Sequence, residues 1–257
     1  MDSTGVSREI RRIVWPVVRE HGFTRTLGRS CYRDWPGGVD VLNFQSCSRY
    51  IADGVGCTTH SFGVNLGLWL REGEYVEHVR RSKAAALVPH EYACDIRGHL
   101  AKGLWQPWFR PYRDLRPGDS PEERVDVWYV KPNGENLDEC ILDALEQITV
   151  KAMPWFDAVH DLDRMARALD SADAAVAATA EGEAEYRDGV RVQGYEWLPD
   201  SLDEVTVALL ALSEDHRDLA RDIAERAAAK ETKYVAWKAR AAAIAERCLA
   251  AERSSEP

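Results

Sequence analysis

The stretch SFGVNLGLWL, residues 61–70, decides the fold because its side chains alternate between two kinds. Successive side chains of a β-strand point to opposite faces of a sheet. One face is unbroken and apolar and consists of Phe62, Val64, Leu66, Leu68 and Leu70. We expect that face to pack on helices, since burial of apolar surface drives folding. The other face is smaller and more polar, and it consists of Ser61, Gly63, Asn65, Gly67 and Trp69.

A second predicted strand, VDVLNFQ at 39–45, carries amides where a buried strand would carry valines. The WPGG turn at 35–38 joins it to a strand at 29–34, which predicts a hairpin. If 39–45 and 61–70 are neighbours, the amides of Asn43, Gln45 and Asn65 gather on one sheet face. Two interpretations stay open. These amides face solvent or pair with backbone groups, or they line a trough that binds a ligand or a partner's backbone.

The remaining pattern predicts an α+β fold. A first helix is expected with Ser7 as its N-cap, and Pro16 predicts a kink or a late start. Further helices are expected at about 90–103 and 135–150, and a fourth strand at 125–130. We therefore expect an antiparallel sheet of about four or more strands packed on helices. After residue 160 the chain is rich in Ala, Glu, Asp and Arg, which predicts an α+β domain at 1–158 and a helical bundle at 159–257.

The charge and the termini restrict the class of partner. Formal net charge is −10 over 257 residues, and no long basic stripe is present. Binding to nucleic acid or to an anionic membrane is therefore disfavoured. No signal peptide and no membrane-spanning run is evident, so a cytoplasmic protein is expected. Its six scattered cysteines are then expected to be reduced and mostly buried.

Four segments carry a family resemblance. HGFTRTLGRSCYRDWPGGVDVLNFQ, SFGVNLGLWL, YACDIRGHL and VDVWYV resemble a bacterial domain-of-unknown-function family, number four-three-zero-four, over about residues 7–156. VLNFQ and FGVNLG are the most specific pieces. The resemblance implies a fold and a bacterial setting, and the family has no established activity. It also implies that Cys94 and Arg97 lie on one helix.

Motifs for catalysis, metals and cofactors have little support. Cys57 and His60 have zinc-ligand spacing, but a structural zinc site needs a second tight pair. No hydrolase elbow, phosphate loop or dinucleotide fingerprint is present, so no cofactor and no catalytic residue are predicted. Cys94 is the best thiol candidate because Arg97, one helical turn away, would lower its pKa. A small buried residue is the alternative interpretation of Cys94.

The segment LWQPWFRPYRD, 104–114, alternates aromatic and arginine side chains between two prolines. It is either a loop that fastens the sheet to the helices or an exposed interaction patch. The candidate partner-binding residues are Trp105, Trp108, Phe109, Arg110 and Tyr112.

Two function hypotheses follow. The first is a non-catalytic protein-interaction module, such as an inhibitor, an immunity protein or a defence-associated factor, with a protein partner. The alternative is a small-ligand-binding protein or an enzyme that uses the polar sheet face. There Asn43, Gln45 and Asn65 would orient a small polar or anionic ligand, and Arg33 or Arg97 would hold an anionic group. A concave pocket favours the alternative, and a shallow apolar patch favours the first. Nothing in the sequence indicates an oligomeric state.

Overall fold

The computed structural model describes residues 3–73, 80–81, 87–100, 102, 122, 124, 126–167, 203–230 and 235–255. These residues form two compact units. The first contains residues 1–34, 40–67 and 97–157, and the second contains residues 35–39, 68–96 and 158–257. Among the described residues, no helix is both long and apolar enough to cross a lipid bilayer.

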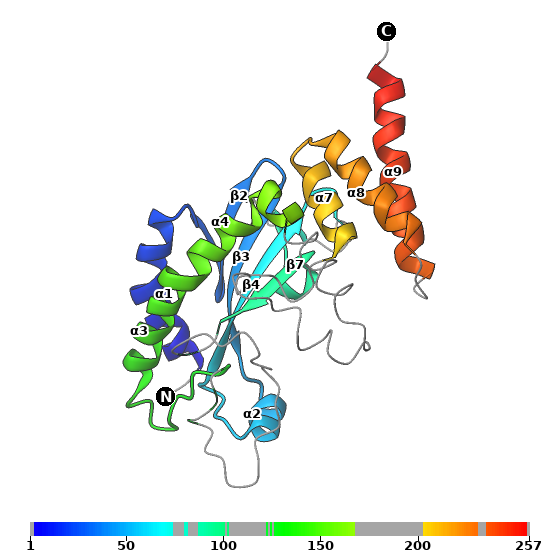
Figure 1. Ribbon diagram of the computed structural model, residues 1–257. Coiled ribbons are helices and arrows are strands. Elements are labelled where there is room, and N and C mark those ends of the chain that lie inside the picture. Colours follow the sequence, from blue (N-terminus) through cyan, green and yellow to red (C-terminus); the bar gives the residue numbers. More distant parts are fainter. Residues whose placement is uncertain are drawn as a thin grey trace. The chain divides into compact units, whose positions relative to one another are not determined.

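The fold is α+β and is built on a five-stranded antiparallel sheet of order β1-β2-β3-β4-β7. Its strands are β1 (Arg25–Leu27), β2 (Ser30–Trp35), β3 (Gly38–Ser46), β4 (Phe62–Leu70) and β7 (Ile96–His99). The first four strands are neighbours in chain order, as in a meander (Figure 1). The hairpin predicted at WPGG is confirmed, since β2 ends at Trp35 and β3 begins at Gly38. A separate two-stranded pair consists of β5 (Arg80–Arg81) and β6 (Leu87–Val88).

Helices cover one face of the sheet within the first unit (Figure 1). They are α1 (Ser3–Glu20), α3 (Leu137–Gln147), the π-helical turn η4 (Ile148–Ala152) and α4 (Met153–Val159). Trp15 of α1 meets Phe44 of β3 edge-on at 5.7 Å between ring centroids. Phe23 meets Phe156 of α4 at 5.2 Å. The predicted apolar face of β4 is fully buried, which confirms the faces deduced from alternation.

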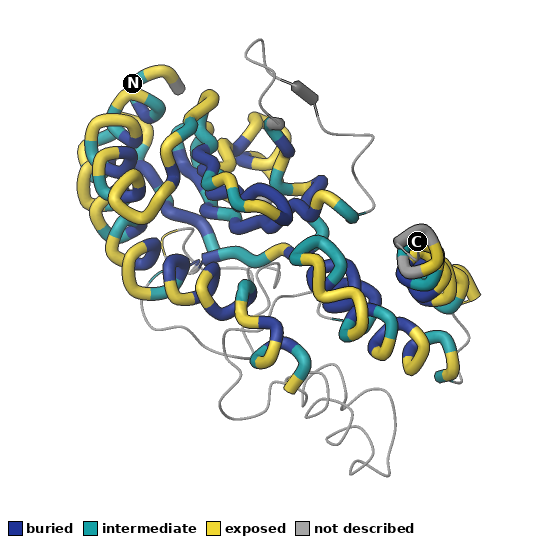
Figure 2. Tube along the Cα trace, turned by 90° about the horizontal axis from the view of Figure 1, so that it is seen from above, coloured by how far each residue is buried: buried dark blue, intermediate teal, exposed yellow. Residues whose placement is uncertain are grey.

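The first helix departs from its prediction at its start. It begins at Ser3, so Ser7 lies inside the helix and its hydroxyl accepts a hydrogen bond from Arg29 Nε at 2.8 Å. Pro16 is inside α1. Val6, Ile10 and Val14 are fully buried along one side of the helix, and this burial outweighs the missing backbone donor of proline. The helix that begins near the N label of Figure 2 alternates accordingly between buried and exposed residues.

Three other segments differ from their predictions. The helix expected at 90–103 is a short 3-10 helix, η2 (Glu91–Ala93), followed by β7. Backbone pairing decides this, because Leu100 N–H donates to Val64 O at 2.9 Å. The strand expected at 125–130 is an isolated bridge between Phe62 and Trp128. The helix α2 (Arg49–Val55) was not predicted, because its seven residues are too few to show an apolar period.

The second unit contains the C-terminal helices α7 (Glu204–Ser213), α8 (Arg217–Ala229) and α9 (Val235–Ser255). Asp203 caps α7 by accepting a hydrogen bond from Thr206 N–H at 2.8 Å. Helical structure after residue 160 is therefore confirmed where it is described. The predicted domain boundary at residue 158 implies that the two parts of the chain fold independently, and it stays a prediction.

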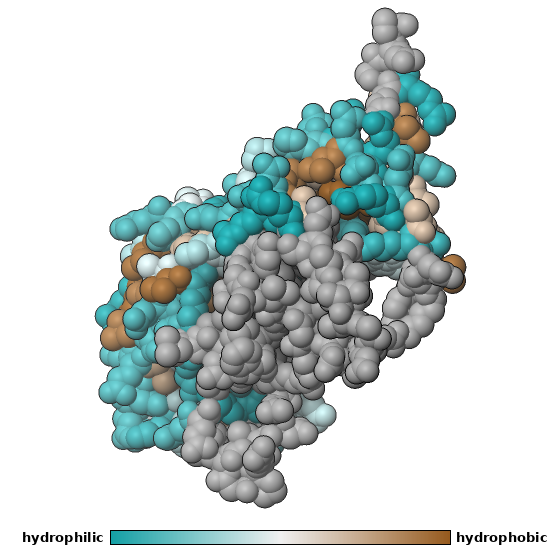
Figure 3. All heavy atoms as spheres, viewed as in Figure 1, coloured by the Kyte–Doolittle hydropathy of each residue, from teal (hydrophilic) through white to brown (hydrophobic). Residues whose placement is uncertain are grey.

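Chain segments from before residue 100 complete the second unit. Glu72 N–H donates to Ser213 Oγ at 3.3 Å, and the Glu72 carboxylate pairs with Arg247 of α9. Trp35 and His160 meet edge-on, with ring centroids 4.6 Å apart. Residues 35–39 and 70–73 are thus held by the helices of their own unit. On the face drawn in Figure 3, hydrophobic surface appears as separate patches among hydrophilic side chains.

Candidate ligand-binding pocket

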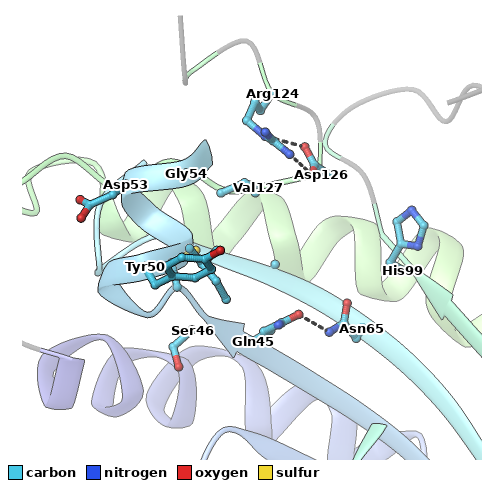
Figure 4. Close-up of a pocket in the computed structure, with 13 residues that line it drawn as sticks. Gln45, Ser46, Tyr50, Asp53, Gly54, Asn65, His99, Arg124, Asp126 and Val127 are labelled. Carbon is cyan, nitrogen blue, oxygen red and sulfur yellow. Dashed lines mark hydrogen bonds and ion pairs between the residues drawn. The ribbon is translucent and has the colours of Figure 1, made fainter. Parts of the chain in front are cut away.

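The polar face of the sheet forms the floor of a pocket in the first unit (Figure 4). The floor residues are Gln45 of β3, Gly63 and Asn65 of β4, and His99 of β7. Asn65 Nδ2 donates to Gln45 Oε1 at 2.8 Å. The two amides are therefore held together on neighbouring strands, where their remaining donor and acceptor atoms are available to the cavity.

Helix α2 forms one wall. It begins because Ser48 Oγ accepts a hydrogen bond from Ile51 N–H at 3.2 Å, and it ends at Gly56, whose φ of 73° suits glycine. Four of its residues face the cavity, namely Tyr50, Ile51, Asp53 and Gly54. Tyr50 is 88% exposed, so its aromatic ring borders the cavity and is packed by few other side chains.

A second wall contains an ion pair. Arg124 Nε donates to Asp126 Oδ1 at 3.0 Å, and Arg124 Nη2 donates to Asp126 Oδ2 at 2.5 Å. Arg124 is only 8% exposed. The hydrogen bond to Asp126 raises the pKa of Arg124 above its ordinary value, so the guanidinium stays charged. Trp128 anchors this segment, because its backbone pairs with Phe62 and its Nε1 donates to Asp143 at 2.6 Å.

The half-open cavity between floor and walls measures about 710 Å³. That volume is within the range of small-molecule sites, which is roughly 300–1,000 Å³. Glycine at position 63 keeps it open. A Cβ added there would sit 3.5 Å from the Asp126 carbonyl oxygen, which is ordinary contact, and any longer side chain would project into the cavity.

The comparisons with known proteins assign the family. The family model called Domain of unknown function (DUF4304) matches residues 14–158. The chain belongs to this family. The matched region contains the sheet, α2 and every residue that lines the pocket. No curated protein and no solved structure matches the chain.

Within the DUF4304 region, the structure brings together two of the five predicted ligand-binding residues. Gln45 and Asn65 line the pocket and contact each other, as their strand faces predicted. Asn43 lies on the same face of β3, but its Nδ2 donates to Ser30 Oγ of β2 at 2.8 Å, and it does not line the pocket. Arg97 is exposed on β7 and does not line the pocket either.

Arg33 also lies outside the pocket, because it neutralises a buried carboxylate on the helix-covered side of the sheet. Its Nε donates to Asp40 Oδ2 at 2.5 Å, and Asp40 is completely buried. The guanidinium lies 5.2 Å from the ring centroid of Phe23 and 5.4 Å from that of Phe156. This arginine is a structural residue, since a buried carboxylate requires a partner.

The structure also locates Cys94 and the other cysteines named in the sequence analysis. Cys94 follows η2 and Arg97 lies in β7, so the expectation that they share a helix is wrong. Cys94 is buried, and its thiol donates to the His90 carbonyl oxygen at 3.6 Å. Within the described part of the chain, no group of three or more His, Cys, Asp or Glu side chains is arranged to hold a metal. All six cysteines are free and four are buried, as expected.

The predicted partner-binding residues, from Trp105 to Tyr112, lie outside the described residues. Conversely, the sequence did not point to the residues of α2, to His99 or to the Arg124–Asp126 pair. Short helices and isolated ion pairs leave no periodic signal. The only usable hint was Gly63, since glycine in a strand marks close approach or open space.

Proposed function

We propose that the protein binds a small, uncharged polar molecule in the pocket on the polar face of the sheet. The observation that carries this proposal is the Gln45–Asn65 amide pair on the floor of a cavity of about 710 Å³. A concave cavity of this size favours ligand binding over the shallow patch expected of an interaction module.

The amide pair presents complementary hydrogen-bonding atoms. One N–H of Asn65 and the Oε1 of Gln45 are used in their mutual bond. The carbonyl oxygen of Asn65 can then accept a hydrogen bond from a ligand, and the amide N–H groups of Gln45 can donate to it. A flat heterocycle or an amide that carries one donor and one acceptor on adjacent atoms could bind this amide pair. The ring of Tyr50 supplies an aromatic surface at the same cavity.

The charges at the pocket favour an uncharged ligand over an anionic ligand. Arg124 lines the cavity, but Asp126 already engages its guanidinium through two hydrogen bonds. Asp53 adds a carboxylate to the wall. Neither Arg33 nor Arg97 lines the pocket. The carboxylates of Asp53 and Asp126 would repel an anion that entered the cavity, and this repulsion offsets the attraction of Arg124.

We place this binding protein in a bacterial cytoplasm, on the family resemblance and on the six free cysteines. From the net charge of −10 we infer that the protein binds neither nucleic acids nor membranes. The interaction module with a protein partner at 104–114 stays a prediction.

The proposal is tested by NMR titration of the labelled full chain with nicotinamide, uracil and adenine. These uncharged heterocycles carry adjacent donor and acceptor atoms. We expect at least one of them to shift the side-chain amide signals of Gln45 and Asn65 in a saturable manner. Asn65→Leu should weaken that binding by about tenfold, because it removes a hydrogen-bonding partner. It should change the free energy of unfolding by less than about 1 kcal/mol, since Asn65 is half-buried and bonds the exposed amide of Gln45.

Substitutions at Gly63 supply the matched control. Gly63→Ala should retain binding, because the added Cβ makes only ordinary contact with Asp126. Gly63→Leu should abolish binding while circular dichroism confirms the fold. Saturable shifts that persist in Gly63→Leu would place the binding elsewhere. A loss of several kcal/mol of stability in Asn65→Leu would make Asn65 a structural amide and would contradict its role in the site.

A further inference from the structure

Two cysteines flank the pocket wall α2. Cys47 directly follows β3 and precedes the helix, and Cys57 directly follows the helix cap Gly56. The backbone holds both ends of this segment. Cys57 N–H donates to Ala52 O at 3.0 Å, and Cys47 N–H donates to Ser61 O at 3.4 Å. The chain thus returns on itself, so that residues separated by a whole helix come together.

The two side chains are in contact. Cys57 packs against a buried cluster made of Cys47, Ala52 and Val127. The two thiols are also close enough for each to shift the pKa of the other. Cys47 is buried but lines the pocket, and Cys57 is partly exposed. Both sulfurs are therefore within reach of a small oxidant.

The surroundings make the two sulfurs unequal. The neighbouring Cys47 thiol lowers the pKa of Cys57 below its ordinary value, and Ser61 and the Arg124 guanidinium act in the same direction. The pKa of Cys47 is raised by the Cys57 thiol and by burial, against the charges of Arg124 and Arg29. Such an asymmetric pair is typical of a reactive thiol and its resolving partner.

We propose that Cys57 and Cys47 form a redox-active dithiol that a peroxide converts into a disulfide across α2. The Cys57 thiolate attacks one oxygen of hydrogen peroxide, the O–O bond breaks, and Cys57 sulfenic acid and hydroxide form. The Cys47 sulfur then attacks the Cys57 sulfur, an S–S bond forms, and the departing hydroxyl leaves as water with the Cys47 proton. The first hydroxide takes the proton that Cys57 had lost. In total, two thiols lose two electrons and one peroxide is reduced to two waters.

This proposal is independent of ligand binding. The disulfide would close the loop 47–57 around α2 and would reduce the freedom of the unfolded chain there. A small thiol can reverse the reaction by exchange, which suits a cytoplasmic protein that is reduced at rest.

The test uses the full, reduced chain treated with one equivalent of hydrogen peroxide and then alkylated. Mass spectrometry should find a loss of two hydrogen atoms and a linked peptide pair that contains Cys47 and Cys57. Before oxidation, Cys57 should react with iodoacetamide at least about tenfold faster than Cys140 at neutral pH. Cys140 is a matched control, because it is also partly exposed but burial raises its pKa to about 11.

Two variants separate the roles of the sulfurs. Cys47→Ser should leave a sulfenic acid on Cys57 that dimedone traps, and Cys57→Ser should leave Cys47 unoxidised under the same conditions. Cys140→Ser should form the disulfide like the wild type. A disulfide that joins other cysteines, or an oxidation of Cys57 no faster than that of Cys140, would overturn the proposal. These two contradicting outcomes are measured on the wild-type chain, so they do not depend on whether a variant folds.

Discussion

At the scale of single residues, the pair of Arg33 and Asp40 shows how burial decides the role of a charged side chain. Both residues occur in strands that alternate polar and apolar positions, so Arg33 was a reasonable candidate to hold an anion. In the structure Asp40 is fully buried, and the Arg33 guanidinium is bonded to it between two aromatic rings. Its charge is used within the fold and is not offered to a ligand.

Replacement of this arginine should therefore damage stability. Arg33→Met removes the guanidinium that pairs with the buried Asp40 carboxylate, and we expect the free energy of unfolding to fall by about 3 kcal/mol. Urea denaturation measures this loss. The control is Arg25→Met, which breaks the exposed pair of Arg25 and Asp34 and should cost less than about 1 kcal/mol. Equal losses in the two variants would contradict the structural role of Arg33.

At the scale of elements, the approach of β3 to β4 depends on the absence of a side chain at the first residue of β3. A Cβ added at Gly38 would overlap the carbonyl oxygen of Trp69, and both residues belong to the second unit. Gly54, inside α2, has nothing within 4 Å of the corresponding position. The same substitution should therefore have opposite effects in the strand and in the helix.

We expect Gly38→Ala to lower the free energy of unfolding by about 2–3 kcal/mol, because backbone atoms must move to accommodate the methyl group. Gly54→Ala should be neutral or should stabilise by up to about 1 kcal/mol, since alanine favours helix more than glycine does. Thermal and urea unfolding of both variants measures the two effects. A tolerated Gly38→Ala would show that β3 and β4 are less closely paired at this point than the structure indicates.

At the scale of the whole molecule, the second unit combines the C-terminal helices with segments from the first hundred residues. Glu72 and Trp35 contact residues after 157, namely Ser213, Arg247 and His160. A chain cut to residues 1–158 should thus unfold at a lower urea concentration than the full chain, with a loss above about 2 kcal/mol.

Tryptophan fluorescence during urea denaturation follows this loss. Glu72→Gln in the full chain is the control, because it weakens only a partly exposed ion pair with Arg247 and should cost less than about 1 kcal/mol. An unchanged midpoint for residues 1–158 would instead support a domain that folds without the C-terminal helices.

The period-two alternation of 39–45 and 61–70 was enough to predict the sheet, its buried face and the contact between Gln45 and Asn65. The same local logic failed at 90–103, where pairing with β4 outweighed helical tendency and formed β7. It also failed at α2, which is too short to show a period. His99, Arg124 and the Cys47–Cys57 contact depend on where those segments lie in space.

The sequence by itself determined the α+β class, the polar sheet face and the family, because these follow from the alternation of side chains and from local motifs. Only the tertiary structure decided that Arg33 is internal, that Asn43 bonds Ser30, and that two cysteines on either side of a helix touch. The physical reason is that strand alternation is a local property, whereas burial, pairing and the walls of a cavity arise from segments far apart in the chain.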